Sequence, residues 1–266
     1  MIGVFDSGYG GLTVFKPLAE KFPNYDLIYF GDNARAPYGD KTQEKIYQYT
    51  REAVDWLFKS GCEMIILACN TASSQALRRI QQESLPGSKY SSRRVLGVLI
   101  PVAEKVAASD ADKIGILATE ATVKSEAYLR EIRKLTPYAE IIQQSAPKLV
   151  PLIEAGKIQN QEMKDAVAEY LGSFKARKIE NIVLGCTHYP LIKHLIQDEM
   201  PKARIFDSPS VIPSALGNYL VRHQEIEQRL SKNGIRKHIT TGKPKKFVKF
   251  AKVFLNIEIE AEKVTL

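Results

Sequence analysis

Short apolar segments rich in β-branched residues alternate with longer amphipathic segments along most of the chain. The short segments predict buried strands at residues 2–5, 26–30, 64–68, 94–98, 113–117, 139–143, 181–184, 203–206 and 236–240. Apolar residues recur at helical spacing in residues 12–21, 43–60, 73–83, 123–135 and 160–175. This alternation is typical of βα units around parallel sheets, so we expect an α/β fold.

The two halves of the chain echo each other. The predicted strand 64–68 is followed by Cys69, and the predicted strand 181–184 is followed after one residue by Cys186. A segment rich in turn formers and charge, residues 85–94, is the best candidate for a linker, and a second crossing is expected near residues 206–209. We therefore expect a first domain of residues 1–92 plus 207–266 and a second, inserted domain of residues 93–206.

Composition places the chain among ordinary globular proteins. It has 266 residues, of which 44% are hydrophobic and 26% charged, and no apolar stretch approaches the ~18 residues that cross a bilayer. The segment Met1–Asp6 lacks the basic start and long apolar core of an export signal, so we expect a cytoplasmic protein. Three cysteines in 266 residues are few, and an odd number cannot all pair, so a disulfide framework is not expected and free thiols are predicted.

The formal net charge of +8 is concentrated near the end of the chain. Residues 229–252 carry nine basic and no acidic side chains, and the rest of the chain is close to neutral. At the end of that segment and just after it, Phe247, Phe250 and Phe254 recur at helical spacing, which favours a docked helix whose lysines face solvent. A nucleic-acid-binding or protein-binding factor that uses this basic segment remains the alternative from another functional class.

Candidate chemistry follows the predicted strands, because ligands of parallel α/β sheets bind beyond the carboxyl ends of the strands. Four loops carry polar and glycine residues at such positions: residues 6–11, 31–39, 69–71 and 186–190. The loop with Gly8, Gly10 and Gly11 could hold an anion on backbone N–H groups, or it could be a tight turn that needs positive φ. It is a weak dinucleotide motif, because Thr13 stands where the third glycine would be.

Two of the three thiols stand in polar surroundings that suit chemistry. Cys69 and Cys186 each follow an apolar strand at the predicted start of a helix, where a thiol ionises more easily. Cys62 has apolar neighbours and is interpreted as a core residue. The chain has no CxxC redox motif, and Cys186, His188 and His194 do not have the spacing of a zinc site, so no metal is expected. Acid–base catalysis by two opposed thiols is the remaining use of the pair.

Four motifs together resemble those of bacterial glutamate racemases, in the same order and over nearly the whole chain. They are residues 3–8 (GVFDSG), 31–39 (GDNARAPYG), 68–73 (ACNTAS) and 184–190 (LGCTHYP). The resemblance implies a cofactor-independent racemase of the aspartate/glutamate racemase superfamily that supplies D-glutamate for peptidoglycan. It further implies two Rossmann-like domains related by a pseudo-two-fold axis, an active site at their interface, and a homodimer.

The resemblance also implies roles for individual residues. Cys69 is expected to act on D-glutamate with help from Asp6, and Cys186 on L-glutamate with help from His188 and Glu154. The substrate would be held by the remaining motif residues: Ser7, Pro37, Tyr38, Gly39, Asn70, Thr71, Thr119 and Thr187. The residue chemistry agrees, because racemisation delivers a proton to the face opposite the one it left, and two monoprotic groups serve that purpose.

Three positions depart from the family pattern. Tyr9 replaces a small aliphatic residue, Asn33 replaces a Thr or Ser, and Lys243 stands where the family often has Asp. None of them removes an expected proton-transfer group. The runner-up function within the superfamily is an aspartate racemase or another racemase with two cysteines.

Overall fold

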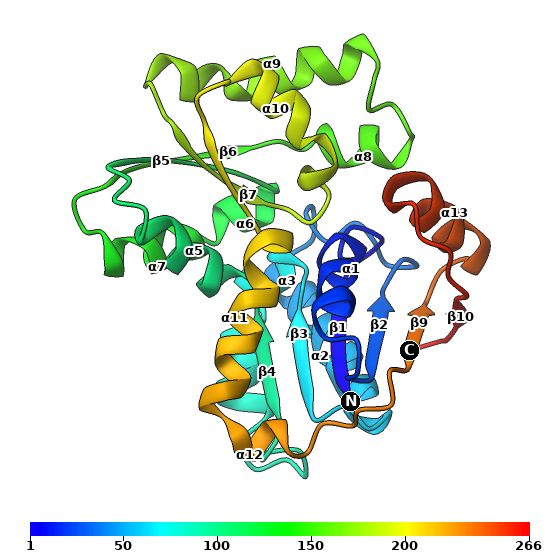
Figure 1. Ribbon diagram of the computed structural model, residues 1–266. Coiled ribbons are helices and arrows are strands. Elements are labelled where there is room, and N and C mark those ends of the chain that lie inside the picture. The colour runs from blue at the N-terminus through cyan, green and yellow to red at the C-terminus, as the bar shows by residue number, and fades with distance from the viewer.

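The computed structural model describes residues 1–266 and contains two parallel sheets with helices on both faces (Figure 1). The first sheet has the strand order β10-β9-β2-β1-β3-β4. Its strands are β1 (Ile2–Asp6), β2 (Leu27–Gly31), β3 (Met64–Leu67), β4 (Arg94–Gly97), β9 (Arg236–Thr240) and β10 (Glu262–Lys263). The predicted strands are confirmed, and only the two-residue edge strand β10 was not expected.

The second sheet repeats the topology of the first. Its order is β6-β5-β7-β8, which matches the order β2-β1-β3-β4 strand for strand. The strands are β5 (Lys113–Ala118), β6 (Glu140–Ser145), β7 (Asn181–Gly185) and β8 (Arg204–Asp207). All strand pairs in both sheets are parallel, which confirms the α/β class and gives a structural basis to the echo between the two halves of the sequence.

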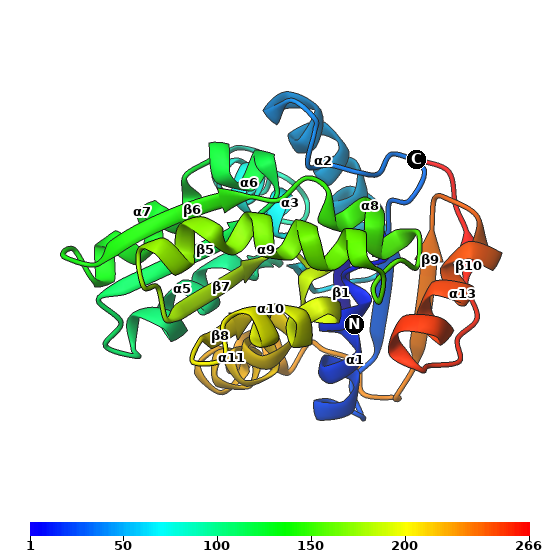
Figure 2. The same ribbon diagram turned by 90° about the horizontal axis from the view of Figure 1, so that it is seen from above.

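Helices cover both faces of each sheet, as buried parallel sheets require (Figures 1 and 2). The long helices are α1 (Leu12–Lys21), α2 (Gln43–Lys59), α5 (Leu99–Ala107), α7 (Ala127–Leu135), α9 (Gln161–Ala176), α11 (Ser208–Arg222) and α13 (Pro244–Leu255). The short ones are α3 (Asn70–Gln75), α4 (Leu77–Arg79), α6 (Glu120–Lys124), α8 (Leu149–Glu154), α10 (Lys193–Glu199) and α12 (Gln224–Glu227). A π-helical turn, Ile80–Ser84, and a 3-10 turn, Tyr189–Ile192, complete the set.

Each sheet is sandwiched between two hydrophobic clusters, because alternate side chains of a strand point to opposite faces. In the central strand β1, Val4 packs with α1, α11 and α13, while Phe5 packs with α2. In the central strand β5, Ile116 packs with α5 and α7, and Leu117 packs with α9. Cys62 is fully buried in the α2 cluster, as the sequence predicts for a core thiol.

The first crossing between the sheets lies one strand later than the linker suggested. The predicted boundary placed Arg94–Gly97 in the second domain, but this strand pairs with β3 in the first sheet. Its backbone completes the edge beside Met64–Leu67, and the chain passes to the second sheet only through α5. After Asp207 the chain returns, and β9 pairs with β2.

Two predicted helices are interrupted. The helix expected over residues 73–83 begins earlier, at Asn70, where the Cys69 side chain accepts a hydrogen bond from the Ala72 N–H, and it breaks at Ala76. The helix expected over residues 123–135 divides at Glu126, whose φ of 52° is left-handed and cannot continue a helix. Apolar periodicity alone does not reveal such breaks.

The basic segment near the end of the chain forms α13 as expected. Phe247 and Phe250 are buried against the first sheet, while Lys245, Lys246 and Lys249 are exposed. Figure 1 shows this helix beside β9 and β10. No helix of the structure combines the length and the apolar character that crossing a membrane requires.

Asp26 ties the return segment of the chain to the start of β2. Its carboxylate accepts hydrogen bonds from the backbone N–H groups of Asn233 and Ile235, both at 2.9 Å, and from the Asn233 Nδ2 at 2.8 Å. Burial opposes ionisation, but these bonds and one from Ser231 outweigh it and lower the pKa of Asp26 to about 2.

We predict that Asp26→Asn lowers the free energy of unfolding by about 2 kcal/mol near neutral pH, measured by urea denaturation. The folded pKa lies below the unfolded value of about 3.9, so the stabilisation is present above that pH and is lost as the pH falls toward about 2. Asp55→Asn, at an exposed position of α2, is the matched control. A deficit that stays constant from neutral to acid pH would contradict this account.

Candidate active site

The carboxyl ends of the two sheets face each other across a cavity of about 600 Å³. Loops from both sheets line it, so neither half of the chain builds it alone. Twelve of the thirteen residues singled out from the sequence line this cavity, and only Asp6 does not. The twelve are Ser7, Pro37, Tyr38, Gly39, Cys69, Asn70, Thr71, Thr119, Glu154, Cys186, Thr187 and His188.

Cys69 stands at the junction of β3 and α3 and caps that short helix. Its Sγ lies 3.4 Å from the Ala72 N–H and 3.4 Å from the Ser7 Oγ. The residue is only 5% exposed, and burial together with the nearby Asp6 carboxylate raises the pKa of the thiol to about 12. At neutral pH Cys69 is therefore a protonated thiol that can donate its proton.

Cys186 stands at the equivalent junction after β7, with a different neighbour. Its Sγ lies 3.9 Å from the His188 Nδ1, and the His188 Nε2 lies 3.0 Å from the Glu154 Oε1 at the end of α8. Burial alone would lower the pKa of His188, but its bonds to Cys186 and Glu154 outweigh burial and raise the pKa to about 10. A positively charged imidazolium thus bridges the second thiol and a carboxylate.

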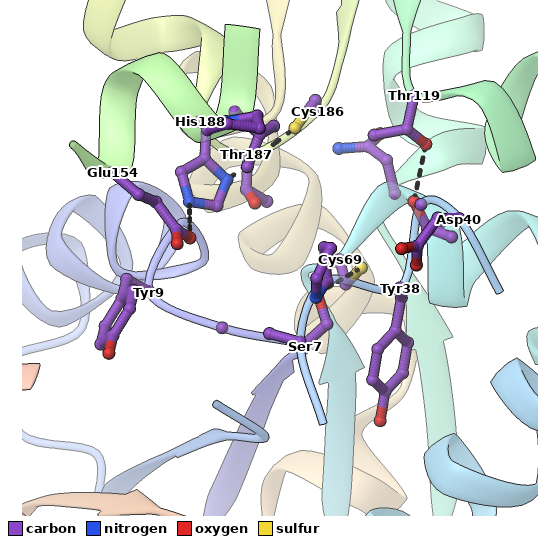
Figure 3. A pocket seen from close by; sticks show the side chains of 18 of the residues that line it. Ser7, Tyr9, Tyr38, Asp40, Cys69, Thr119, Glu154, Cys186, Thr187 and His188 are labelled. Carbon is purple, nitrogen blue, oxygen red and sulfur yellow. Dashed lines mark hydrogen bonds and ion pairs between the residues drawn. The ribbon is translucent and has the colours of Figure 1, made fainter. Parts of the chain in front are cut away.

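Figure 3 shows the two thiols on opposite sides of one space, Cys69 beside Ser7 and Cys186 beside Thr187 and His188. The side chain of Glu154 lies on the far side of His188 from Cys186. Because β3 and β7 hold equivalent places in the two sheets, the two cysteines approach the cavity from opposed directions. A molecule bound between them would present one face to each sulfur.

Asp6 lies behind the cavity wall rather than in it. It is 1% exposed, and its carboxylate accepts hydrogen bonds from the Gly8 N–H at 2.9 Å and from the Thr187 Oγ1 at 3.1 Å. Burial raises the pKa of Asp6, although the His188 charge and these hydrogen bonds oppose that rise. Its direct partners in the unliganded protein are thus Gly8 and Thr187, and it makes no hydrogen bond to Cys69.

Hydroxyl and amide groups from both domains meet on the wall next to Cys69. The Thr71 Oγ1 lies 2.8 Å from the Thr119 Oγ1, which lies 2.9 Å from the Thr122 Oγ1. The Asn70 Oδ1 accepts a hydrogen bond from the buried Tyr128 hydroxyl at 2.6 Å, which leaves the Asn70 Nδ2 buried without a partner. Such a fixed, unpaired donor is suited to a carboxylate.

The loop after β2 contributes shape more than hydroxyl chemistry. The Tyr38 hydroxyl donates to the Asp32 Oδ2 at 2.5 Å, and Arg35 donates to the same oxygen at 2.7 Å. The Tyr38 hydroxyl is therefore engaged inside the loop, and the residue lines the cavity with its ring and backbone. At Gly39 a Cβ would lie 3.2 Å from the Thr119 Cβ, so this glycine allows the two domains to approach.

The glycines after β1 serve close packing, and the alternative of a turn with positive φ is wrong. None of Gly8, Gly10 and Gly11 has a positive φ. A Cβ on Gly10 would lie 2.4 Å from the Thr187 Oγ1, and a Cβ on Gly11 would lie 2.4 Å from the Asp6 Cβ. Glycine is required at position 10 because the loops of the two domains touch there, and at position 11 because Asp6 of the same domain packs against it.

Sequence reasoning missed several residues of the cavity. Lys246 reaches it from α13, whose lysines were interpreted only as a solvated face, and Tyr9 and Asn33 reach it from the first and second loops. Tyr9 stacks on Phe250 with ring centres 5.0 Å apart, which joins α13 to the wall. Both residues lie in candidate loops, 6–11 and 31–39, and both depart from the family pattern, but neither was singled out as a site residue. No group of three or more His, Cys, Asp or Glu side chains is arranged to hold a metal ion.

Comparisons with known proteins all point to the same family. The model of the Asp/Glu/hydantoin racemase family matches residues 11–214. A glutamate racemase from Sulfurihydrogenibium sp. is 40% identical over 267 residues, which cover 100% of this chain and 97% of that protein.

Solved structures give the same result. A glutamate racemase isoform from Bacillus anthracis superposes with a TM-score of 0.90 at 30% identity, over 100% of this chain and 97% of its own. The Francisella tularensis glutamate racemase, solved in complex with D-glutamate, has a TM-score of 0.89 at 32% identity, over 99% and 97% of the two chains. The chain therefore belongs to the Asp/Glu/hydantoin racemase family, and within that family it groups with the glutamate racemases.

Proposed function

We propose that this protein interconverts L- and D-glutamate by moving a proton at Cα between two thiols, without a cofactor. One observation carries the proposal: Cys69 and Cys186 follow equivalent strands of two equivalent sheets and line a single cavity. The substrate of the related enzymes supports glutamate as the amino acid. Cys186 acts on the L-enantiomer and Cys69 on the D-enantiomer.

The proton path from L- to D-glutamate uses the two thiol environments in turn. The Cys186 sulfur, as thiolate, removes the Cα proton on one face, and the His188 imidazolium 3.9 Å away stabilises the negative charge on that sulfur before transfer. Cys69 then gives its proton to the opposite face, which suits the raised pKa of that thiol. In the reverse direction the two cysteines exchange roles.

The cavity must also stabilise the carbanion, because the Cα proton of an amino acid is a very weak acid. The unpaired Asn70 Nδ2 and the Thr71 hydroxyl are the donors that we assign to the substrate carboxylates, while the Thr187 hydroxyl lines the cavity and donates its hydrogen to Asp6. Fixed donors in a site that excludes water stabilise developing charge more than the same groups do in water. Without a pyridoxal group, these donors carry this task.

The biological setting follows from the activity. D-glutamate is the product that peptidoglycan synthesis consumes, so we place the enzyme in the supply of that precursor. All three cysteines are free thiols, which suits the reducing cytoplasm. Lys245, Lys249 and Lys252 of α13 are exposed around a buried aromatic core and Lys246 also lines the cavity, so these lysines need no nucleic acid to account for them.

The direct test is circular dichroism of L-glutamate mixed with purified protein that is free of pyridoxal phosphate. We expect the signal to decay to zero as the racemic mixture forms, and L-aspartate under the same conditions to react far more slowly. A clear preference for aspartate would overturn glutamate as the substrate and favour the aspartate racemase alternative.

We predict that each cysteine serves one enantiomer. Cys186→Ser should lower α-hydrogen exchange of L-glutamate in heavy water by about 10²-fold or more, and it should affect D-glutamate less; Cys69→Ser should show the reverse pattern. Cys62→Ala, in the core beside α2, is the control that leaves both exchange rates intact. Equal losses on both enantiomers in each serine variant would refute the assignment of faces.

We predict that His188→Asn impairs chiefly the L-side exchange, by about 10-fold or more, because the variant removes the imidazolium next to Cys186. Asparagine keeps a polar side chain of similar reach in the buried position. Glu154→Gln, which keeps a hydrogen-bond partner for the His188 Nε2, should show a smaller effect with the same preference. An L-side rate that is unchanged in His188→Asn would end the role assigned to that residue.

A further inference from the structure

Asn33, in the loop after β2, carries a hydrogen-bond donor with no partner in the protein. Its Nδ2 atom is buried and makes no hydrogen bond, although the residue lines the central cavity. A buried donor without an acceptor costs free energy in the empty site, and a ligand that supplies the acceptor regains it.

The orientation of the Asn33 amide is fixed from behind. The Thr240 hydroxyl on β9 donates a hydrogen bond to the Asn33 Oδ1 at 2.7 Å and accepts one from the Gly242 N–H at 3.0 Å. Because Thr240 already accepts from Gly242, its own hydrogen points to the oxygen of Asn33, and the NH₂ group of Asn33 is turned the other way. Gly242 packs so closely that a Cβ there would lie 2.7 Å from the Asn33 Cβ.

Asn70 repeats this arrangement on the other side of β1. A hydroxyl, that of Tyr128, holds the Asn70 Oδ1 at 2.6 Å, and the Asn70 Nδ2 is likewise buried, unpaired and part of the cavity wall. The cavity thus contains two asparagine NH₂ groups, each held by a hydroxyl on its carbonyl oxygen and each lacking an acceptor. Glutamate carries two carboxylates.

The position of Asn33 decides which carboxylate it can reach. β1 lies between β2 and β3, so the ends of β2 and β3 are about 10 Å apart, two strand spacings. The substrate Cα must lie beside the Cys69 sulfur after β3. With the α-carboxylate held by Asn70, the neighbour of Cys69, the substrate side chain would extend toward Asn33.

The Asn33 Nδ2 lies close to Gly8, in a part of the cavity wall that also includes Glu154. A carbon placed where Gly8 would carry a Cβ lies 3.8 Å from the Asn33 Nδ2, 3.9 Å from the Ala36 Cβ and 3.9 Å from the Glu154 Oε1. The charge of Glu154 is engaged by the His188 imidazolium, and Lys246 also lines the cavity. This wall can therefore accept an anionic group.

We propose that the Asn33 Nδ2 donates a hydrogen bond to the side-chain carboxylate of the substrate and so helps select an amino acid of the length of glutamate. The inference rests on the proposed function, because it takes glutamate as the ligand between the two thiols. Asn33 acts equally on both enantiomers, since it stands beside neither sulfur.

Asn33→Ala and the isosteric Asn33→Asp test the role. Asn33→Asp keeps the oxygen that Thr240 binds and replaces the donor with an anionic acceptor, so the loop keeps its anchor. Asn24→Ala, an exposed asparagine before the amino end of the same strand, is the matched control. Each protein is assayed for racemisation from both directions, and D-norvaline, which has the side-chain length of glutamate without the carboxylate, is assayed as a competitive inhibitor.

We expect KM for glutamate to rise about 10-fold or more in Asn33→Ala, further in Asn33→Asp, and equally for the two enantiomers, with a much smaller change in kcat. The inhibition constant of D-norvaline should change less than threefold in Asn33→Ala, because norvaline never engages the amide. A merely structural role would instead weaken glutamate and norvaline together, and that result, or an unchanged KM, would overturn the inference.

The outcomes separate this inference from the proposed function. Wild-type protein that fails to racemise glutamate would defeat the proposed function itself. Wild-type protein that racemises glutamate, with Asn33 variants whose preference for glutamate over norvaline is unchanged, would defeat only the role of Asn33. If Asn33→Ala fails to fold, the isosteric Asn33→Asp provides the test, by the same comparison of KM for glutamate with the inhibition constant of D-norvaline.

Discussion

The close approach of two loops, one from each sheet, is the constraint on which the site depends. The Thr13 hydroxyl donates to the Thr187 carbonyl at 2.9 Å, and the Thr187 hydroxyl donates to Asp6 at 3.1 Å. Glycine at position 10 leaves the room that these contacts need. With this contact in place, the ends of β3 and β7 face each other and their thiols share one cavity. The repeated strand order supplies equivalent positions, and the loop contact turns them toward a common centre.

Equivalent positions do not give the two thiols equivalent surroundings. Cys69 lies near a buried carboxylate and accepts a backbone N–H, whereas Cys186 lies beside an imidazolium that is itself paired with Glu154. The two sheets share a topology but give their thiols two different electrostatic environments, a buried carboxylate near Cys69 and an imidazolium beside Cys186. Racemisation removes a proton on the side of one sulfur and delivers one from the other, so the two thiols have different tasks in each direction and can have different surroundings.

Much of this arrangement could be predicted from the sequence, because β-branched runs and the residues that follow them are local signals. Nine strands and twelve of the cavity residues were found in that way or through the family motifs. Two features were missed: the helix break at Glu126, which depends on the positive sign of its φ, and the pairing of Arg94–Gly97 with β3 in the first sheet. Neither the sign of φ nor the pairing partner of a strand can be read from apolar periodicity. Lys246 and Asn33 were missed for the same reason. Helix α13 is held at the cavity by packing of Phe247 and Phe250 on Tyr9, and Asn33 is oriented by Thr240; both sets of partners are distant in the chain.

The contact of α13 with the cavity wall has a consequence for the synthesis of the enzyme. Phe250 of α13 contacts both Tyr9 and, edge on, the His188 ring at 6.0 Å, so the wall of the cavity includes residues close to the end of the chain. A polypeptide emerges from the ribosome amino end first. Both thiols are therefore translated well before the aromatic residues of α13 that support their surroundings, and this wall of the cavity is complete only after α13 has been synthesised.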